Sequence, residues 1–219
     1  MVRNMKNNIS VVITTYRNRG HLFEIIKAWL DMGVKVYLAN SNPSPMIFGH
    51  PNFLNVQFSG DIGNKTRFVV SHATSTDYVL LADDDVLPKP GILEDFWKYR
   101  DAGILGLFGR KFNGEPTYLQ TKHFRADKVE QVQDVSFVGV VYFTHRKHLV
   151  FDLNNLKNSA LDDLYWQLLK MPKVKKYVIP SKNYIDLPEC NDAEGIFHSP
   201  GTRDLRNEFY KKYGGKNAI

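Results

Sequence analysis

Disulfides, membrane spans and secretion signals are all missing from this sequence of 219 residues. Cys190 is the only cysteine, which excludes an internal disulfide framework and fits a reducing compartment. No apolar run approaches the roughly 20 residues needed to cross a bilayer. The polar, basic stretch 1–8 runs straight into a strand-like segment and is not a signal peptide. These absences predict a cytoplasmic protein with no transmembrane segment.

The chain also lacks an acidic excess. Lys and Arg number 29 against 23 Asp and Glu, so the formal net charge is +6. This balance is compatible with an anionic ligand or with a solvated basic face, and part of it lies in the lysine-rich stretch 170–176. We expect no nucleic-acid partner. A basic protein that binds nucleic acid or a polyanionic glycan is the alternative from another functional class, and it predicts strongly salt-dependent affinity.

Repeats, low-complexity tracts and long linkers are absent too, and the first ninety residues alternate between strand and helix patterns. Short apolar or β-branched runs at 9–14, 34–39 and 78–81 predict buried strands. Apolar residues at helical spacing predict a helix over 22–30, and a second helix is expected over 64–73. Two β-α-β units of this kind predict an α/β fold with a parallel sheet flanked by helices.

Beyond Gly103 the pattern changes to apolar runs separated by a loop rich in polar and aromatic residues. The elements predicted there are strands at 104–108 and 135–143 and helices at 161–169 and 203–213. The length fits one compact domain. We expect its two halves to meet at a shared cleft.

Three adjacent carboxylates, Asp83, Asp84 and Asp85, follow the predicted strand at 78–81. Ligands of open parallel sheets bind outside the carboxyl ends of the strands. Two unit charges ~4 Å apart repel by about 4 kcal/mol at an effective dielectric constant of about 20. A divalent cation removes this repulsion and bridges to a diphosphate, and hard oxygen ligands suit Mg²⁺ or Mn²⁺. The alternative for this D-x-D pattern is a solvated acidic turn.

Polar side chains also follow the first two predicted strands. Thr14, Thr15, Tyr16 and Arg17 come at the carboxyl end of the first strand, where they can line a base and ribose pocket. Asn40 ends the second strand, and its amide can pair with the edge of a base. An ordinary strand-to-helix connection explains the first group equally well.

The segment that opens the second predicted helix carries two cations. Asn64, Lys65 and Arg67 lie in its first turn, where backbone amides and positive charge favour phosphate. The glycine spacing is not that of a Walker loop. Arg67 can also be a surface residue of an amphipathic helix.

A second acid pair lies at the start of the predicted helix over 161–169. Ser159 and Asp162 have the spacing of a capping box, which gives Asp162 a structural role. Asp163 points about 100° away and is freer to face a substrate. There it can orient an acceptor hydroxyl, act as general base or stabilise positive charge on a sugar. The alternative is a second acid that stabilises the helix dipole.

A glycine-bearing loop precedes the last predicted helix, at 194–203. A neutral His198 is a candidate metal ligand, although a lone histidine is more often a surface residue. Arg203 can neutralise a leaving diphosphate. Such a loop is expected to act as a lid that closes over a bound donor.

Several of these stretches resemble one family. Residues 10–17 and the aspartate triplet are similar to glycosyltransferases of the GT-A fold, including family-2-like nucleotide-sugar transferases. A more specific resemblance is to the exostosin-type catalytic domain, which transfers N-acetylhexosamine from UDP-sugars with retention. The matching stretches are 78–85, 104–111, 138–147 and 162–164, together with the pattern His198, Arg203 and Asn207-Glu208-Phe209.

The resemblance implies a fold and a set of roles. It implies a GT-A type, Rossmann-like, mixed but mostly parallel sheet with a smaller acceptor-side sheet. A single domain over 1–219 would bind the nucleotide-sugar through 1–100 and the acceptor through 101–219. The roles implied for its side chains are Asp85 as main metal ligand, Asp83 and Asp84 at the ribose, donor sugar or metal, Arg67 near the nucleotide, Asp163 with Asp162 at the catalytic centre, and Arg203 at the diphosphate.

The activity expected is metal-dependent transfer of a hexose from a nucleoside-diphosphate sugar, a UDP-sugar by the resemblance, to a hydroxyl of a glycan or glycoprotein. Retention is implied by the resemblance, and inversion with Asp163 as general base is the alternative. Leu161 replaces a cysteine that is usual in the family, and the chain is shorter, so the identity of the sugar is not carried over. A sugar-nucleotide pyrophosphorylase is disfavoured because the stretch 15–20 is not the glycine-rich loop it needs.

Overall fold

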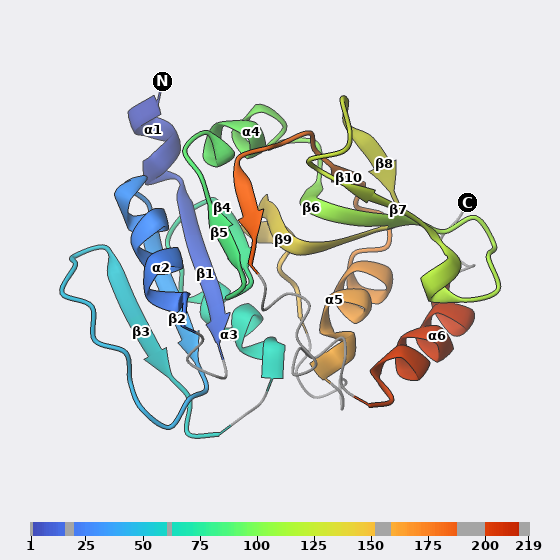
Figure 1. Cartoon of the computed structure of the whole chain (residues 1–219), viewed down its shortest axis with the longest axis horizontal. Helices are drawn as coiled ribbons and strands as arrows, with labels where there is room; N and C mark the ends of the chain where they lie inside the picture. The colour runs from blue at the N-terminus through green and yellow to red at the C-terminus, as the bar shows by residue number, and fades with distance from the viewer. Residues whose placement is uncertain (1, 16–19, 61–62, 152–158, 188–199, 215–219) are drawn as a thin grey trace.

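The computed structural model describes residues 2–15, 20–60, 63–151, 159–187 and 200–214. Its main feature is a nine-stranded sheet with the order β3-β2-β1-β4-β9-β6-β10-β8, and β7 pairs with β6 (Figure 1). The four strands of the first half are mutually parallel: β1 (Ile9–Thr15), β2 (Lys35–Asn40), β3 (Phe53–Gln57) and β4 (Tyr78–Ala82).

The sequence pattern accounts for the middle of this sheet. Every residue of β1 and of β4 is buried, as expected where helices cover both faces of a parallel sheet. The helices of this half are α1 (Val2–Asn7), α2 (Leu22–Asp31), α3 (Thr66–His72) and α4 (Ile92–Lys98). Helix α2 buries the apolar residues whose spacing predicts it, and Gly33 follows with a positive φ of 82°.

The second half extends the sheet with strands of both directions. Strand β9 (Phe137–His145) is antiparallel to β4, and β6 (Ile104–Lys111) is antiparallel to β9. The remaining strands are β7 (Lys122–Arg125), β8 (Gln133–Val135) and β10 (Lys176–Val178), and a second, two-stranded sheet pairs β5 (Val86–Pro88) with β11 (Tyr184–Asp186). The predicted mixed, mostly parallel α/β fold with a small second sheet is confirmed.

Two helical segments pack against this second half. Helix α5 (Asp162–Tyr165) continues into a π-helical turn at Trp166–Lys170, and α6 (Thr202–Tyr213) follows nearer the C-terminus. Short 3-10 turns lie at Gly63–Lys65, Tyr118–Gln120, Arg146–His148 and Ser159–Leu161. A second apolar core, separate from the main one, joins α5 and α6 to the ends of β6 and β9 through residues such as Phe112, Phe137 and Leu164.

Several element boundaries differ from the prediction. The predicted strand at 135–143 is two strands, because Val135 ends β8 and β9 begins only at Phe137. The predicted helix at 64–73 opens with a 3-10 turn before α3. Strand β3 was not predicted, because as an edge strand it buries no residue completely and its apolar pattern is weak. No helix among the described residues is long and apolar enough to span a membrane.

The order of the strands places a ligand site. From β1 the chain moves to β2 and β3 on one side and then returns to place β4 on the other side of β1. Neighbouring connections therefore leave β1 in opposite directions, and in open α/β sheets such a reversal marks the place where ligands bind, outside the carboxyl ends of the strands, here β1 and β4. Thr15 ends β1, and the aspartate triplet follows β4. The predicted site residues of these two strands thus converge at the switch point of the sheet.

Candidate functional site

A hydrogen bond ties the two strand ends at the switch point together. The hydroxyl of Thr15, a buried residue, donates to Asp84 Oδ2 over 2.7 Å. A hydrogen bond to a charged acceptor is worth about 1.5–3 kcal/mol. Thr15 and Asp84, both predicted nucleotide contacts, therefore join the end of β1 to the segment that follows β4.

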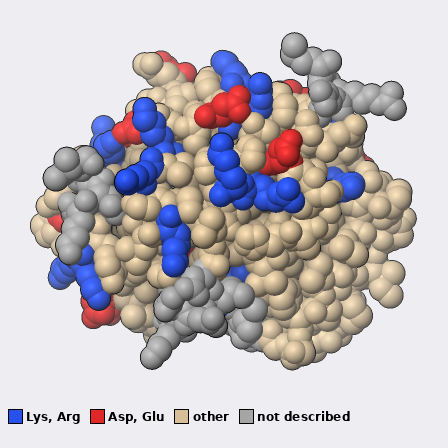
Figure 2. All heavy atoms as spheres, turned by 180° about the vertical axis from the view of Figure 1, so that it is seen from behind, with Lys and Arg blue, Asp and Glu red and all other residues tan. Residues whose placement is uncertain are grey.

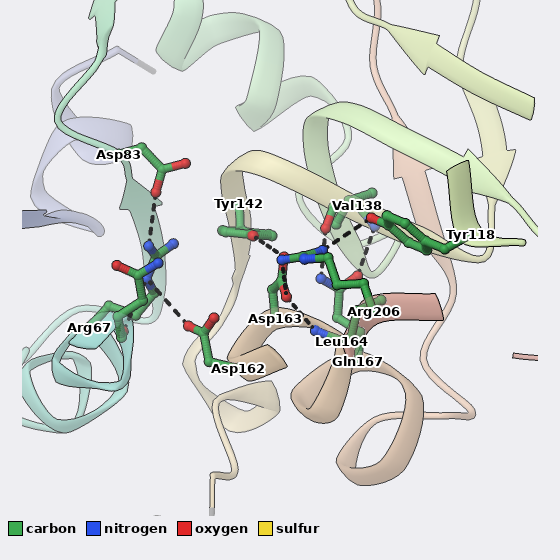
Figure 3. A network of polar contacts seen from close by, with 11 residues as sticks. Arg67, Asp83, Tyr118, Val138, Tyr142, Asp162, Asp163, Leu164, Gln167 and Arg206 are labelled. Carbon is green, nitrogen blue, oxygen red and sulfur yellow. Dashed lines mark hydrogen bonds and ion pairs between the residues drawn. The ribbon is translucent and has the colours of Figure 1, made fainter. Parts of the chain in front are cut away.

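Arg67 lies between two carboxylates, those of Asp83 and Asp162 (Figure 3). Only 3% of its surface is exposed, and its Nη2 donates to Asp83 Oδ1 at 2.9 Å. Its Nε donates to the carbonyl oxygen of Asn64 at 3.2 Å and lies 3.8 Å from Asp162 Oδ2. The guanidinium also stands over the ring of Tyr142, 5.6 Å from the centroid. The alternative of an exposed Arg67 on an amphipathic helix is therefore wrong.

The neighbouring carboxylates stabilise the positive charge of Arg67. Burial alone would lower the pKa of Arg67, but Asp83 and Asp162 outweigh it and raise the pKa above its usual value. Asn64 and Lys65 are half-buried in the 3-10 turn that leads into α3. Contact of Arg67, Asn64 and Lys65 with a phosphate stays a prediction, but a fixed positive charge does stand beside the aspartates.

Asp163 is enclosed by donors. Arg206 Nη2 lies 2.9 Å from each of its carboxylate oxygens, and the Leu164 amide donates to Oδ1 at 2.7 Å. The hydroxyl of Tyr142 donates to Oδ2 at 3.4 Å. Asp163 was predicted to be the freer acid, and this is wrong because Arg206 and its neighbours occupy both oxygens. A catalytic role for Asp163 stays a prediction.

Asp162 has the opposite environment. It is 3% exposed, and its Oδ2 is buried without a hydrogen-bond partner among the described residues. Burial, aided by the charge of Asp163, raises the pKa of Asp162 to about 7, while Arg67 and Arg206 oppose the shift. Leaving such an acceptor unpaired costs roughly 1–3 kcal/mol. The predicted capping box is also wrong, because α5 begins at Asp162 itself, with Leu161 at the cap position.

Arg206 is the residue of the candidate site that the sequence prediction missed. Its Nη1 also donates to the hydroxyl of Tyr118 at 3.1 Å, and it is 9% exposed. The predicted diphosphate ligand, Arg203, lies one turn earlier on α6 and is exposed. A signal was present, because Thr202, Arg206 and Tyr210 form an i, i+4 stripe that turns out to be the buried face of α6.

A β-bulge lies next to Tyr142, the residue that contacts both Asp163 and Arg67. Between the pairs Gly106–Tyr142 and Phe108–Gly139, β9 has one residue more than β6. Within this bulge Val140 has a φ of 70°, which is rare for a β-branched residue. Strain of this kind persists where the surroundings hold it, often beside a functional site. Here it lies two residues before Tyr142, which contacts both Asp163 and Arg67.

The predicted base pocket contains one engaged amide and two unpaired hydroxyls. Asn40 is fully buried and donates to Ser44 and Asn55, while its oxygen accepts from Asn42. Its amide is thus used within the protein, which leaves little for reading a base. By contrast, Thr14 Oγ1 and Ser41 Oγ are buried without a hydrogen-bond partner among the described residues. Tyr16 and Arg17 lie outside the described residues.

The aspartate triplet fits a metal only in part. Asp83, Asp84 and Asp85 are all half-buried, and carboxylate oxygens are hard ligands that suit Mg²⁺ or Mn²⁺. The described residues nevertheless include no group of three His, Cys, Asp or Glu that could hold a metal ion. Phosphate oxygens of a ligand would have to complete the shell. The third predicted ligand, His198, and most of the predicted lid lie outside the described residues.

Comparison with known proteins identifies the fold. No model of a protein family matches the chain, and no curated protein matches its sequence. The structure is similar to that of TarS 1–349 from S. aureus, with a TM-score of 0.55 and 15% identity over 81% of this chain and 59% of that chain. TarS 1–349 in complex with UDP-GlcNAc matches with a TM-score of 0.54 and 15% identity, over 81% and 57% of the two chains.

A longer TarS structure matches with a TM-score of 0.57 and 14% identity, over 81% of this chain and 36% of that one. This chain therefore spans less than two thirds of each of these TarS chains. TarS 1–349 has also been solved with UDP. At such identities the likeness concerns the fold, and the resemblance to the exostosin type stays a prediction. The chain has a GT-A-like α/β fold.

Proposed function

We propose that this protein is a glycosyltransferase that moves a sugar from a nucleoside-diphosphate sugar, a UDP-sugar in the first instance, to a hydroxyl of a glycan or glycoprotein. The observation that carries the proposal is the convergence of Arg67, Asp83 and Asp162 at the switch point of a GT-A-like sheet. The complexes of TarS with UDP and UDP-GlcNAc support the choice of nucleotide. Because TarS has been solved with UDP-GlcNAc, donors that carry an N-acetylhexosamine should be tested as well as donors that carry a hexose.

Each part of the site has a role in this proposal. The unpaired hydroxyls of Thr14 and Ser41 would meet the base or ribose. Arg67 would hold Asp83 in place for the donor and add positive charge close to the diphosphate. Asp85, with Asp83, would hold Mg²⁺ or Mn²⁺, which when bound supplies charge stabilisation to the leaving diphosphate. Arg203 would reach the same phosphates from the start of α6.

Thermal unfolding with nucleotide and metal tests this proposal. A ligand at 100 times its Kd stabilises the native state by about 2.7 kcal/mol, which raises the Tm of a domain of this size by about 5–11 °C. We expect UDP and Mn²⁺ together to produce a shift that neither produces alone, because the described carboxylates form no complete metal site. Asp85→Ala should abolish this shift, whereas Asp31→Asn, on the exposed surface of α2, should keep it. A full shift in Asp85→Ala, or no shift with any nucleotide, would contradict the proposal.

Binding of a polyanion such as nucleic acid or an anionic glycan, without catalysis, is the second candidate function. Figure 2 shows Lys and Arg side chains gathered over one part of a face, with a few acidic side chains among them. Such a surface would bind polyanions without metal and with an affinity that falls steeply with salt. A polyanion shift that disappears at high salt, with no response to UDP and Mn²⁺, would favour this candidate.

A further inference from the structure

One edge of the main sheet lies at the opposite end of the strands from the candidate site. Strands β4, β6 and β10 begin at this edge and β9 ends there, as their pairing registers show. In Figure 1 helix α4 and the first residues of β1 lie at the top, whereas β1 ends, next to the candidate site, near the bottom. The segments that connect to the strands at this edge are 72–77, 98–103, 146–150 and 170–175.

These four segments, which we name the basic edge, carry nearly all of the net charge of the chain. Seven of their residues are Lys or Arg and two are Asp, which gives +5 of the total of +6. The rest of the chain is close to neutral, with 22 basic residues (29 − 7) and 21 acidic residues (23 − 2). The positive excess is therefore a local feature and not an evenly spread solvated charge. The basic residues that are exposed are Lys98, Arg146, Lys147, Lys173 and Lys175.

The two acids of the basic edge offset little of this charge. Asp101 lies 3.5 Å from Arg100 Nε, in a pair that is largely exposed, and the other acid, Asp77, is exposed. Exposed pairs of this kind interact weakly because water and salt screen them. Arg146 Nη1 donates to the carbonyl oxygen of Thr74 at 2.6 Å, which fixes the guanidinium beside the segment 72–77 without neutralising it. The basic edge therefore presents positive charge to the solvent.

Aromatic and apolar side chains stand among these cations. Trp97 is half-buried, and the guanidinium of Arg100 lies 4.7 Å from the centroid of its ring. The ammonium of Lys98 lies 5.0 Å from the ring centroid of Tyr99, which is also half-buried. Val150 is 52% exposed and shares its segment with two exposed cations. Amphipathic rings and apolar side chains beside Lys and Arg are typical of surfaces that rest at the boundary between lipid headgroups and acyl chains.

We propose that the basic edge docks on a membrane that contains anionic phospholipid. The exposed cations would pair with the negative headgroups, and Trp97, Tyr99 and Val150 would reach the interface. The ring contacts favour lipid over an unpaired nucleic-acid strand, because Arg100 and Tyr78 already cover the Trp97 ring on which a base would stack. The proposal does not depend on the proposed function. If both hold, the candidate site faces away from the bilayer, since it lies at the other end of the strands.

Sedimentation with vesicles at physiological salt tests the proposal. We expect the wild type to sediment with vesicles of phosphatidylcholine and phosphatidylserine but not with phosphatidylcholine alone. The triple variant Lys147→Gln, Lys173→Gln and Lys175→Gln should bind about 100-fold more weakly, because each basic residue close to such a surface contributes about fivefold to the affinity.

A second triple variant controls for net charge. Lys122→Gln, Lys211→Gln and Lys212→Gln removes the same charge from exposed residues outside the basic edge. These residues should contribute far less to binding, because charges are screened beyond a Debye length of about 8 Å. All six lysines are exposed, so both variants should keep the Tm of the wild type.

Tryptophan fluorescence separates contact with lipid from binding of any polyanion. The chain has three tryptophans, and Trp29 and Trp166 are fully buried. Phospholipids brominated on their acyl chains should therefore quench Trp97, and the quenching should be lost in Trp97→Phe. Tighter binding to heparin or to DNA than to the vesicles, without quenching of Trp97, would assign the basic edge to a polyanion and overturn the proposal.

Two further results would overturn the docking surface. One is a wild type that does not sediment with the anionic vesicles. The other is an equal loss of binding in the two triple variants, which would show that net charge and not the basic edge is responsible. Either result can occur in a protein that responds to UDP and Mn²⁺, so failure of this proposal is distinct from failure of the proposed function.

Discussion

Removing the positive charge that faces Asp163 should destabilise the fold strongly. Arg206 and Asp163 each have 11% of their side chains exposed, and the pair is held by two contacts of 2.9 Å. Arg206→Met would keep the length of the side chain but leave a buried carboxylate uncompensated, which costs about 3–5 kcal/mol. The hydrogen bond to Tyr118 and the contact of the guanidinium with its ring would be lost as well. For a domain of this size the corresponding fall in Tm is about 6–20 °C.

A double-mutant cycle measured by urea unfolding separates the contribution of the Arg206–Asp163 ion pair from that of side-chain packing. Apolar replacement of both partners of a buried ion pair is often neutral or stabilising, so Asp163→Leu combined with Arg206→Met should recover most of the lost stability. The exposed Arg203→Met on the same helix is the control and should change the free energy of unfolding by less than about 0.5 kcal/mol. A cost below about 1 kcal/mol for Arg206→Met, or a double variant no more stable than the single, would refute this account.

Two further predictions concern other buried polar groups. Burial lowers the pKa of Lys176 from 10.5 to about 8, with Asp134 opposing the shift, so the unfolded chain binds more protons between these values and stability should rise with pH in this window. We expect the free energy of unfolding, measured with urea, to rise by about 2 kcal/mol from pH 8 to pH 10 in the wild type but not in Lys176→Met. The same rise with pH in both proteins would contradict this prediction. Thr15→Val removes the donor to Asp84 and should cost about 1.5–3 kcal/mol of unfolding free energy. Thr15→Ser keeps the hydroxyl, and equal stability of the two variants would show that the hydrogen bond contributes nothing.

The first half of the fold could be predicted because its signals are local. Strands β1 and β4 are continuous apolar runs buried on both faces, and α2 carries its apolar residues at helical spacing. The edge strand β3 was not predicted, because its half-exposed residues show no clear alternation of apolar and polar positions. In the second half, the boundary between β8 and β9 and the π-helical turn after α5 depend on pairing with distant strands and on Gln167, which bonds both backbone groups of Val138.

The sequence by itself determined which acids follow which strand, and therefore that the triplet at 83–85 lies at the carboxyl edge of the sheet. Local sequence is enough for this conclusion, because a residue that follows a strand lies at the carboxyl end of that strand, where ligands of open α/β sheets bind. Only the tertiary structure decided that β4 lies beside β1, that Arg67 faces inward, that Arg206 holds Asp163, and that Asp162 Oδ2 has no hydrogen-bond partner among the described residues. These outcomes depend on the rotation of α3, α5 and α6 about their axes as they pack, and one residue of difference on a helix turns a side chain by about 100°.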